Sequence, residues 1–152
     1  SRYKKTFVKF YRINEKPYGC FSNFSKHPIE LEGKTWPTSE HYFQAKKFEG
    51  SHHEEEIRLA KTPAIAARMG NTREQPLRAD WEEVKEKIMY EALKAKFTQH
   101  NECRKLLLQT RDALLIEHTK NDSYWTDGGD GKGKNRLGVL LMELRDELKK
   151  ET

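Results

Sequence analysis

The chain changes from a strand pattern to a helix pattern at one stretch, Trp36-Pro37-Thr38-Ser39-Glu40-His41-Tyr42-Phe43-Gln44-Ala45-Lys46-Lys47-Phe48. Thr38 or Ser39 supplies the hydroxyl that typically caps a helix N-terminus, and Gly50 is a typical residue after a helix end. The pattern therefore predicts a helix over about residues 40–48.

One face of this predicted helix carries a carboxylate, an amide and an amine, because Glu40, Gln44 and Lys47 are spaced by four and then three residues. In one interpretation these are ordinary solvated groups, the usual state of such residues. In the other, the stripe lines a cleft, and Phe43 with Trp36 provides apolar surface that desolvates the charged pair. The carboxylate can then move protons, and an amine of lowered pKa can attack an electrophilic carbon such as the anomeric carbon of a ribose.

The rest of the chain is mostly helical by its apolar spacing. Outward from this stretch, the pattern predicts strands over 7–13 and 29–31, a turn at Gly33, helices over 54–61, 64–69, 81–97, 101–109 and 137–148, and a short buried strand over 113–116. The predicted class is α+β, as a single helix-dominated domain with a small β-sheet that spans residues 1–152.

Composition limits the class of protein. The 152 residues fit one domain, which can bury roughly 68–70% of the surface exposed by its unfolded chain. Cys20 and Cys103 form no disulfide framework and lack zinc-ligand spacing, so no metal is expected. No apolar run approaches the roughly 18 residues of a membrane span, which predicts a cytoplasmic protein with no membrane partner. The net charge of +5 suits phosphorylated metabolites and nucleic acid alike.

A glycine-dense segment precedes the last predicted helix, with four glycines within residues 128–133. Glycines allow backbone amides to approach a ligand, and free N–H groups at a helix start suit an anion. A flexible surface loop is the other interpretation, which Tyr124 and Trp125 just upstream weaken. The stretch from Gly128 to Asn135 resembles a phosphate-binding P-loop, but Asn135 replaces the Ser or Thr that holds magnesium, so ATPase or GTPase activity is not expected.

A third segment, Phe21-Ser22-Asn23-Phe24, lies between the first two predicted strands. Two aromatic rings around an amide can clamp a heterocycle by stacking while the amide reads its edge. Phe21 and Phe24 can equally belong to the core, where phenylalanine is usually found.

These segments together resemble the NADAR family, also called YbiA-like, which is described as riboflavin biosynthesis intermediates N-glycosidases. The resemblance extends from about Phe10 to Leu148. It is carried by Phe21-Ser22-Asn23-Phe24, by the stretch 36–48, by Ala67-Arg68-Met69-Gly70, and by Tyr124-Trp125 through Gly138. One departure is Thr126, where the family commonly has glycine, and it puts the substrate preference in doubt more than the chemistry.

The resemblance implies hydrolysis of a C–N glycosidic bond on a ribose, with no metal and no organic cofactor. Members act on early phosphorylated riboflavin intermediates, and others remove ADP-ribose from guanine bases. The implied partner is therefore a phosphorylated ribosyl small molecule, with ADP-ribosylated nucleic acid or an NAD-derived conjugate as the alternative. A non-catalytic nucleotide-binding module is the competing class of function.

The resemblance also implies a set of site residues. The family's catalytic pair falls on Glu40 and Lys47, with Lys47 as the nucleophile that forms a Schiff base, or with direct attack by water and Glu40 as the base. Arg68 is a candidate phosphate partner because guanidinium groups bind phosphate with two hydrogen bonds, although it also suits a surface ion pair. The expected substrate contacts are Phe21, Asn23, Phe24, Trp36, Gln44, Arg68, Trp125, Asp127, Gly131 and Asn135.

Overall fold

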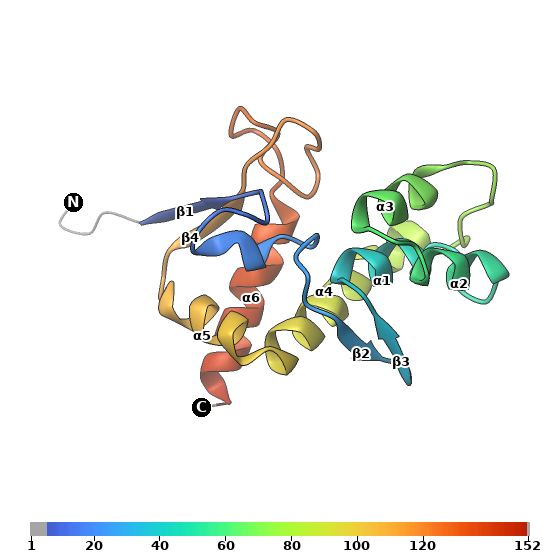
Figure 1. Ribbon diagram of the computed structural model, residues 1–152. Helices are drawn as coiled ribbons and strands as arrows, with labels where there is room; N and C mark the ends of the chain where they lie inside the picture. The colour runs from blue at the N-terminus through green and yellow to red at the C-terminus, as the bar shows by residue number, and fades with distance from the viewer. Residues whose placement is uncertain (1–5, 152) are drawn as a thin grey trace. The chain divides into compact units, whose positions relative to one another are not determined.

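The computed structural model describes residues 6–151, which form two compact units (Figure 1). The first unit combines the N-terminal segment through Ser22 with the chain from His100 onward, and the second is Asn23–Gln99. Among the described residues the α-helices number six and the strands four, so the α+β class is confirmed. The single domain over 1–152 stays a prediction. No helix in the described range is long and apolar enough to cross a membrane.

The first unit is built on a parallel pair of strands, β1 (Phe7–Phe10) and β4 (Leu114–Glu117), which lie side by side in register from Phe7 opposite Leu114 (Figure 1). Its helices are the short 3-10 helix η1 (Tyr18–Phe21), α5 (Asn101–Gln109) and α6 (Arg136–Lys150). Helix α6 packs against β4 and carries a stripe of leucines at helical spacing, Leu137, Leu140, Leu141, Leu144 and Leu148, all of them buried.

The second unit is built around helix α1 (Ser39–Lys46), which packs against α2 (His52–Arg58), α3 (Pro63–Asn71) and α4 (Trp81–Gln99) (Figure 1). A hairpin of β2 (Ile29–Leu31) and β3 (Lys34–Trp36) precedes it. The two residues between the strands, Glu32 and Gly33, both have positive φ, as a tight two-residue hairpin turn requires.

Every residue of α1 is buried, including its polar ones. The helix begins as predicted, with Thr38 as the N-cap residue, whose hydroxyl accepts a hydrogen bond from the His41 amide at 3.2 Å. Because buried polar groups are costly unless they are paired, the polar side chains of this helix need hydrogen-bond partners within the helix or on neighbouring segments.

Three predicted features differ in the structure. The predicted small sheet is two separate two-stranded sheets in the described chain. The first strand ends at Phe10 rather than Ile13. The third helix was expected to end before Gly70, but it continues through this residue to Asn71, since Gly70 serves close helix packing and has no left-handed backbone angle.

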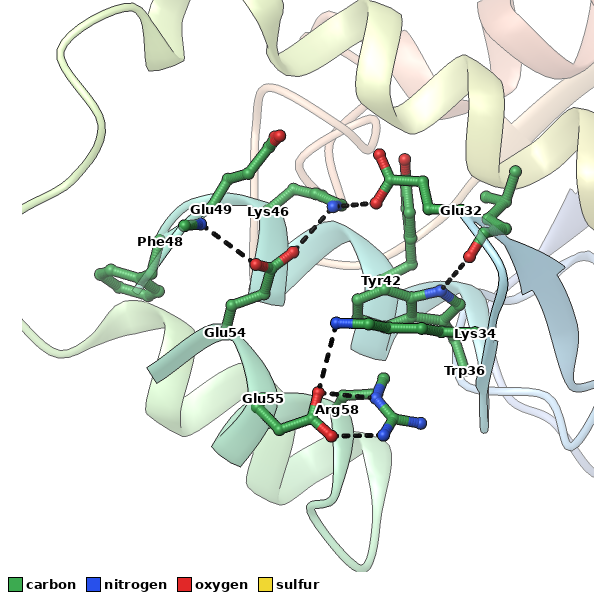
Figure 2. A network of polar contacts seen from close by, with 12 residues as sticks. Glu32, Lys34, Trp36, Tyr42, Lys46, Phe48, Glu49, Glu54, Glu55 and Arg58 are labelled. Atoms are coloured by element: carbon green, nitrogen blue, oxygen red, sulfur yellow. Dashed lines mark hydrogen bonds and ion pairs between the residues drawn. The ribbon is translucent and has the colours of Figure 1, made fainter. Parts of the chain in front are cut away.

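The buried Lys46 joins three elements of the second unit in an ionic cluster (Figure 2). Its ammonium donates hydrogen bonds to Glu32 in the hairpin turn and to Glu54 in the first turn of α2, the latter at 2.7 Å. The rings of Trp36 and Tyr42 lie 5.4 and 5.3 Å from Lys46 Nζ. Burial alone would lower the pKa of Lys46, but the hydrogen bonds and negative charges of the two glutamates outweigh it and raise that pKa.

Replacing Lys46 tests whether this cluster stabilises the second unit. Lys46→Met leaves the mostly buried Glu54 carboxylate without its cation. We expect a loss of about 2–3 kcal/mol in the free energy of unfolding, less than the roughly 3–5 kcal/mol for a fully buried pair because Glu32 is half exposed. Urea denaturation measures this free energy. The control is Lys87→Met at an exposed lysine, which should change stability by less than about 0.5 kcal/mol. Equal midpoints for the two variants would contradict a stabilising cluster.

Candidate active site

Lys47 is the C-cap residue that follows α1, and it carries a buried amine that faces neutral acceptors. Its side chain is 7% exposed, and Nζ donates to the Gly70 carbonyl at 3.3 Å and to Asn71 Oδ1 at 3.1 Å. The rings of Phe43 and Trp81 each lie 5.9 Å from Nζ. The amine is therefore desolvated by two aromatic rings and held by oxygens that carry no full negative charge.

This environment lowers the pKa of Lys47 to about 8, mainly because burial penalises the charged ammonium. The negative charge of Glu40 opposes the shift, and the positive charges of Arg73 and Lys85 increase it. A lysine with a pKa near 8 keeps a substantial neutral fraction near neutral pH. It can therefore act as a nucleophile, which an ordinary lysine cannot do efficiently.

Glu40 lies in the first turn of α1 and is almost fully buried. Gln44, one turn further along, donates from Nε2 to Glu40 Oε2 at 2.7 Å. The Glu40 backbone amide donates to the Asn23 carbonyl at 3.2 Å, which fixes the start of the helix. The structure thus brings the predicted carboxylate and amide into direct contact, and places the carboxylate close enough to Lys47 for its charge to act on the amine.

The two adjacent lysines at the C-terminal end of α1 have opposite environments. Lys46 is saturated by two carboxylates and its pKa is raised, whereas Lys47 faces neutral oxygens and its pKa is lowered. Only Lys47 of this pair combines a reactive amine with an electrostatic link to Glu40.

His41 is part of the scaffold of α1. Its Nε2 lies 2.9 Å from the Ala60 carbonyl, and its Nδ1 lies 2.8 Å from the Thr38 hydroxyl. This pairing fits a neutral ring that donates from Nε2 and accepts at Nδ1. Burial lowers its pKa, which favours the same neutral form.

Four further predicted substrate contacts lie in the second unit. Asn23 is buried, accepts a hydrogen bond from the Ser39 hydroxyl at 2.8 Å and donates to Met89 Sδ, so its amide holds the N-terminus of α1. Trp36 is completely buried and donates from its indole to the Leu31 carbonyl. Both side chains have structural partners here, and their contact with substrate stays a prediction.

Phe24 and Arg68 are more accessible. Phe24 is half-buried, and Arg68 is exposed on α3, the helix that supplies the acceptors for Lys47. An exposed guanidinium is free to reach an anionic group, so the predicted phosphate contact of Arg68 is compatible with its position.

The other five predicted contacts lie in the first unit. Phe21 is completely buried, with Phe10 and Tyr18 at ring-centre distances of 5.6 and 5.3 Å, which agrees with the core alternative. Trp125 is half-buried beside Tyr124, and Gly131 is exposed with a φ of 82°.

Asp127 and Asn135 stabilise the glycine loop through hydrogen bonds of their side chains. Asp127 binds His118 Nδ1 at 2.7 Å through one carboxylate oxygen, and it accepts the Gly129 amide at 2.8 Å through the other. Asn135 bonds at both ends of its amide to strand β4, to the Glu117 amide and the Leu115 carbonyl. Their predicted ligand contacts would have to compete with these bonds.

The expectation of free amides at the start of α6 is wrong for its first two residues. The amides of Arg136 and Leu137 donate to the carbonyls of Tyr124 and Trp125, each at 3.0 Å. The loop before the helix folds back on itself and satisfies these groups, which removes their capacity to bind an anion.

Thr126, the departure from the family pattern, is buried within the same loop. Its hydroxyl donates to the carbonyls of Thr119 and Asp122 and accepts the Gly128 amide at 3.1 Å. The side chain thus ties the loop to itself.

Sequence reasoning did not assign four residues that surround Lys47. They are Gly70 and Asn71, whose oxygens accept from the amine, Trp81, whose ring covers it, and Arg73, whose charge lowers its pKa. The motif that ends at Gly70 was a usable signal, since glycine within a helix pattern indicates close packing. Trp81 is the first residue of the helix predicted over 81–97, and nothing in the local sequence shows that its ring covers an amine.

Comparison with known proteins agrees with this reading of the chain. The model of the NADAR domain family matches residues 9–149. N-glycosidase YbiA of Escherichia coli (strain K12) is 60% identical over 143 residues, which cover 94% of this chain and 89% of that protein. The riboflavin biosynthesis protein PYRR, chloroplastic, of Zea mays is 40% identical over 163 residues, covering 97% of this chain and 26% of that protein.

The fold has a solved counterpart as well. The NMR structure of the E. coli protein YbiA superposes with a TM-score of 0.90 at 58% sequence identity, and covers 98% of this chain and 88% of that one. These comparisons confirm the resemblance to the NADAR, or YbiA-like, family, and with it the enzyme class rather than a non-catalytic binding module. The chain therefore belongs to the NADAR domain family and is an N-glycosidase.

Proposed function

We propose that this N-glycosidase cleaves the C–N bond between ribose 5-phosphate and the base or amine of an early phosphorylated riboflavin intermediate. The buried Lys47 amine, with a pKa of about 8 beside Glu40, is the observation that carries this proposal. The name of the maize relative, a riboflavin biosynthesis protein, supports the choice of substrate class. The net charge of +5 suits a phosphorylated substrate.

In the proposed mechanism the neutral Lys47 amine attacks the anomeric carbon of the ribose. The new C–N bond to Nζ forms as the bond to the base nitrogen breaks, and the base leaves after taking up a proton. Glu40 moves protons as the sugar ring opens to a Schiff base with Lys47. Water then adds to the imine carbon, the bond to Nζ breaks, and ribose 5-phosphate leaves with Lys47 regenerated. The net reaction consumes one water molecule.

Cation placement supports a phosphorylated substrate near Lys47. Arg73 and Lys85 both act electrostatically on the amine, and Arg68 is exposed on the neighbouring helix α3. Positive charge in a site attracts anionic ligands, so all three groups favour binding of the 5-phosphate, while Arg73 and Lys85 also lower the pKa of Lys47.

A direct assay tests the substrate class. The protein is incubated with 5-amino-6-ribosylaminouracil 5′-phosphate, with its pyrimidine precursor, and with ADP-ribosylated guanosine. We expect release of ribose 5-phosphate from the first two, because their single phosphate and C–N bond fit the proposed chemistry. Release of ADP-ribose alone would overturn the riboflavin assignment and favour the de-ADP-ribosylating alternative.

Borohydride trapping tests the covalent step. Reduction during turnover should attach the sugar phosphate to Lys47 in the native enzyme, detected by the mass of the peptide that contains it. Lys47→Met should give no adduct and no measurable turnover, because the nucleophile is absent. Near-normal turnover in Lys47→Met would instead indicate direct attack by water.

A second variant tests the carboxylate. Glu40→Gln should slow turnover by about 10²–10⁴-fold through loss of proton transfer.

The pH dependence tests the state of the amine. Lys47 attacks only when deprotonated, so kcat/KM should rise with pH through about 8 and then level off. Arg73→Gln removes a positive charge that lowers this pKa, so the rising limb should move to higher pH. The exposed Lys61→Gln, which removes the same charge elsewhere in the unit, should leave the limb in place. An unmoved limb in Arg73→Gln would contradict the electrostatic account.

A further inference from the structure

Gly70, in the C-terminal turn of α3, lies close to both proposed catalytic groups, Glu40 and Lys47. Its carbonyl oxygen accepts a hydrogen bond from the Lys47 ammonium at 3.3 Å. On its Cα side it packs against Gln44, the residue that donates to Glu40. We propose that Gly70 is a positioning residue that sets the placement of Glu40 and Lys47, an inference that rests on the function proposed above.

Contact with Gln44 leaves no room for a side chain at position 70. A Cβ atom there would lie 2.0 Å from Gln44 Oε1, 2.7 Å from Cδ and 2.8 Å from Cβ. Rotation of the glutamine can move its Oε1 and Cδ, but its Cβ is fixed to the backbone of α1. Any side chain at Gly70 therefore has to push the two helices apart or displace the turn that Gln44 occupies.

Gln44 transmits this constraint to Glu40. Its Nε2 donates to Glu40 Oε2 at 2.7 Å, while its Oε1 is buried and has no hydrogen-bond partner among the residues that the structure describes. The amide is therefore oriented by Glu40 on one side and confined by Gly70 on the other. An orientation with the amide oxygen toward the carboxylate would place two acceptors together, so only one orientation is compatible with an ionised Glu40.

The backbone does not explain a glycine at this position. Gly70 lies within α3 and its φ is outside the left-handed region. Glycine in a helix costs about 1 kcal/mol relative to alanine, so local stability favours alanine here. The close contact with Gln44 explains why this helical position carries glycine.

The carbonyl of Gly70 completes the link. The last carbonyls of a helix have no partner within it, so this oxygen is available to Lys47. The neighbouring Asn71 Oδ1 accepts from the same ammonium at 3.1 Å. The segment 70–71 thus binds the Lys47 amine through two oxygen atoms. It also confines Gln44, which in turn orients the Glu40 carboxylate.

Gly70→Ala tests the proposal. We expect kcat to fall by about 10–100-fold with a small change in KM, because displaced reacting groups lose rate more than binding. In the Gln44→Gly background, which removes the opposing side chain, adding Gly70→Ala should cost less than twofold further, since the two residues act through one contact. Additive losses would contradict a shared contact.

A pair of variants at Asn71 tests the amine half of the proposal without changing the core. Asn71 is exposed, so both variants are expected to fold. Asn71→Ala removes an acceptor that stabilises the ammonium and should move the rising limb of kcat/KM to lower pH. Asn71→Asp adds a negative charge and should move it to higher pH. Limbs that stay in place would show that this segment does not hold the amine.

The outcomes separate this inference from the proposed function. If borohydride traps the adduct on Lys47 while Gly70→Ala keeps the wild-type kcat and pH profile, the positioning function is wrong and the covalent mechanism stands. If no adduct forms and Lys47→Met stays active, the mechanism itself is wrong.

Discussion

Burial of helix α1 on all sides is the constraint on which the second unit depends. Three helices pack against it, and all eight of its residues are buried, although five of them, Ser39, Glu40, His41, Gln44 and Lys46, carry polar or charged side chains. A buried polar group without a partner destabilises the fold, so the neighbours of α1 must supply partners one by one. The hairpin turn, α2, the segment between α2 and α3, and the segment before β2 each do so. The same constraint produces an environment in which an amine changes its pKa.

The adjacent lysines show how such an environment differentiates identical groups. Successive residues on a helix point about 100° apart, so Lys46 and Lys47 face different neighbours. Two carboxylates compensate the burial of Lys46, and its charged form is favoured. Lys47 meets neutral oxygens and aromatic rings, and its charged form is disfavoured. The same residue type, one position apart, therefore provides a structural ion pair at Lys46 and an amine of lowered pKa at Lys47.

The glycine loop of the first unit uses its polar residues differently from what its motif suggests. Asp127, Asn135 and Thr126 make their hydrogen bonds to the loop backbone, to His118 and to strand β4. Gly138 has a comparable function, because a Cβ there would lie 2.0 Å from the Leu115 carbonyl. The glycine-rich segment, predicted to bind a ligand, thus also fixes the position of α6 on β4.

The sequence by itself determined a helix over about residues 40–48, the last helix α6, the α+β class, and the shared face of Glu40, Gln44 and Lys47, because these follow from local spacing and capping. Only the tertiary structure decided which lysine is desolvated, that Trp81 rather than Trp36 covers it, and that Gly70 faces Gln44. Burial and charge at a side chain depend on residues brought from distant parts of the chain. Local patterns carry no record of those contacts, so they identify the candidate groups and leave their reactivity to the packing.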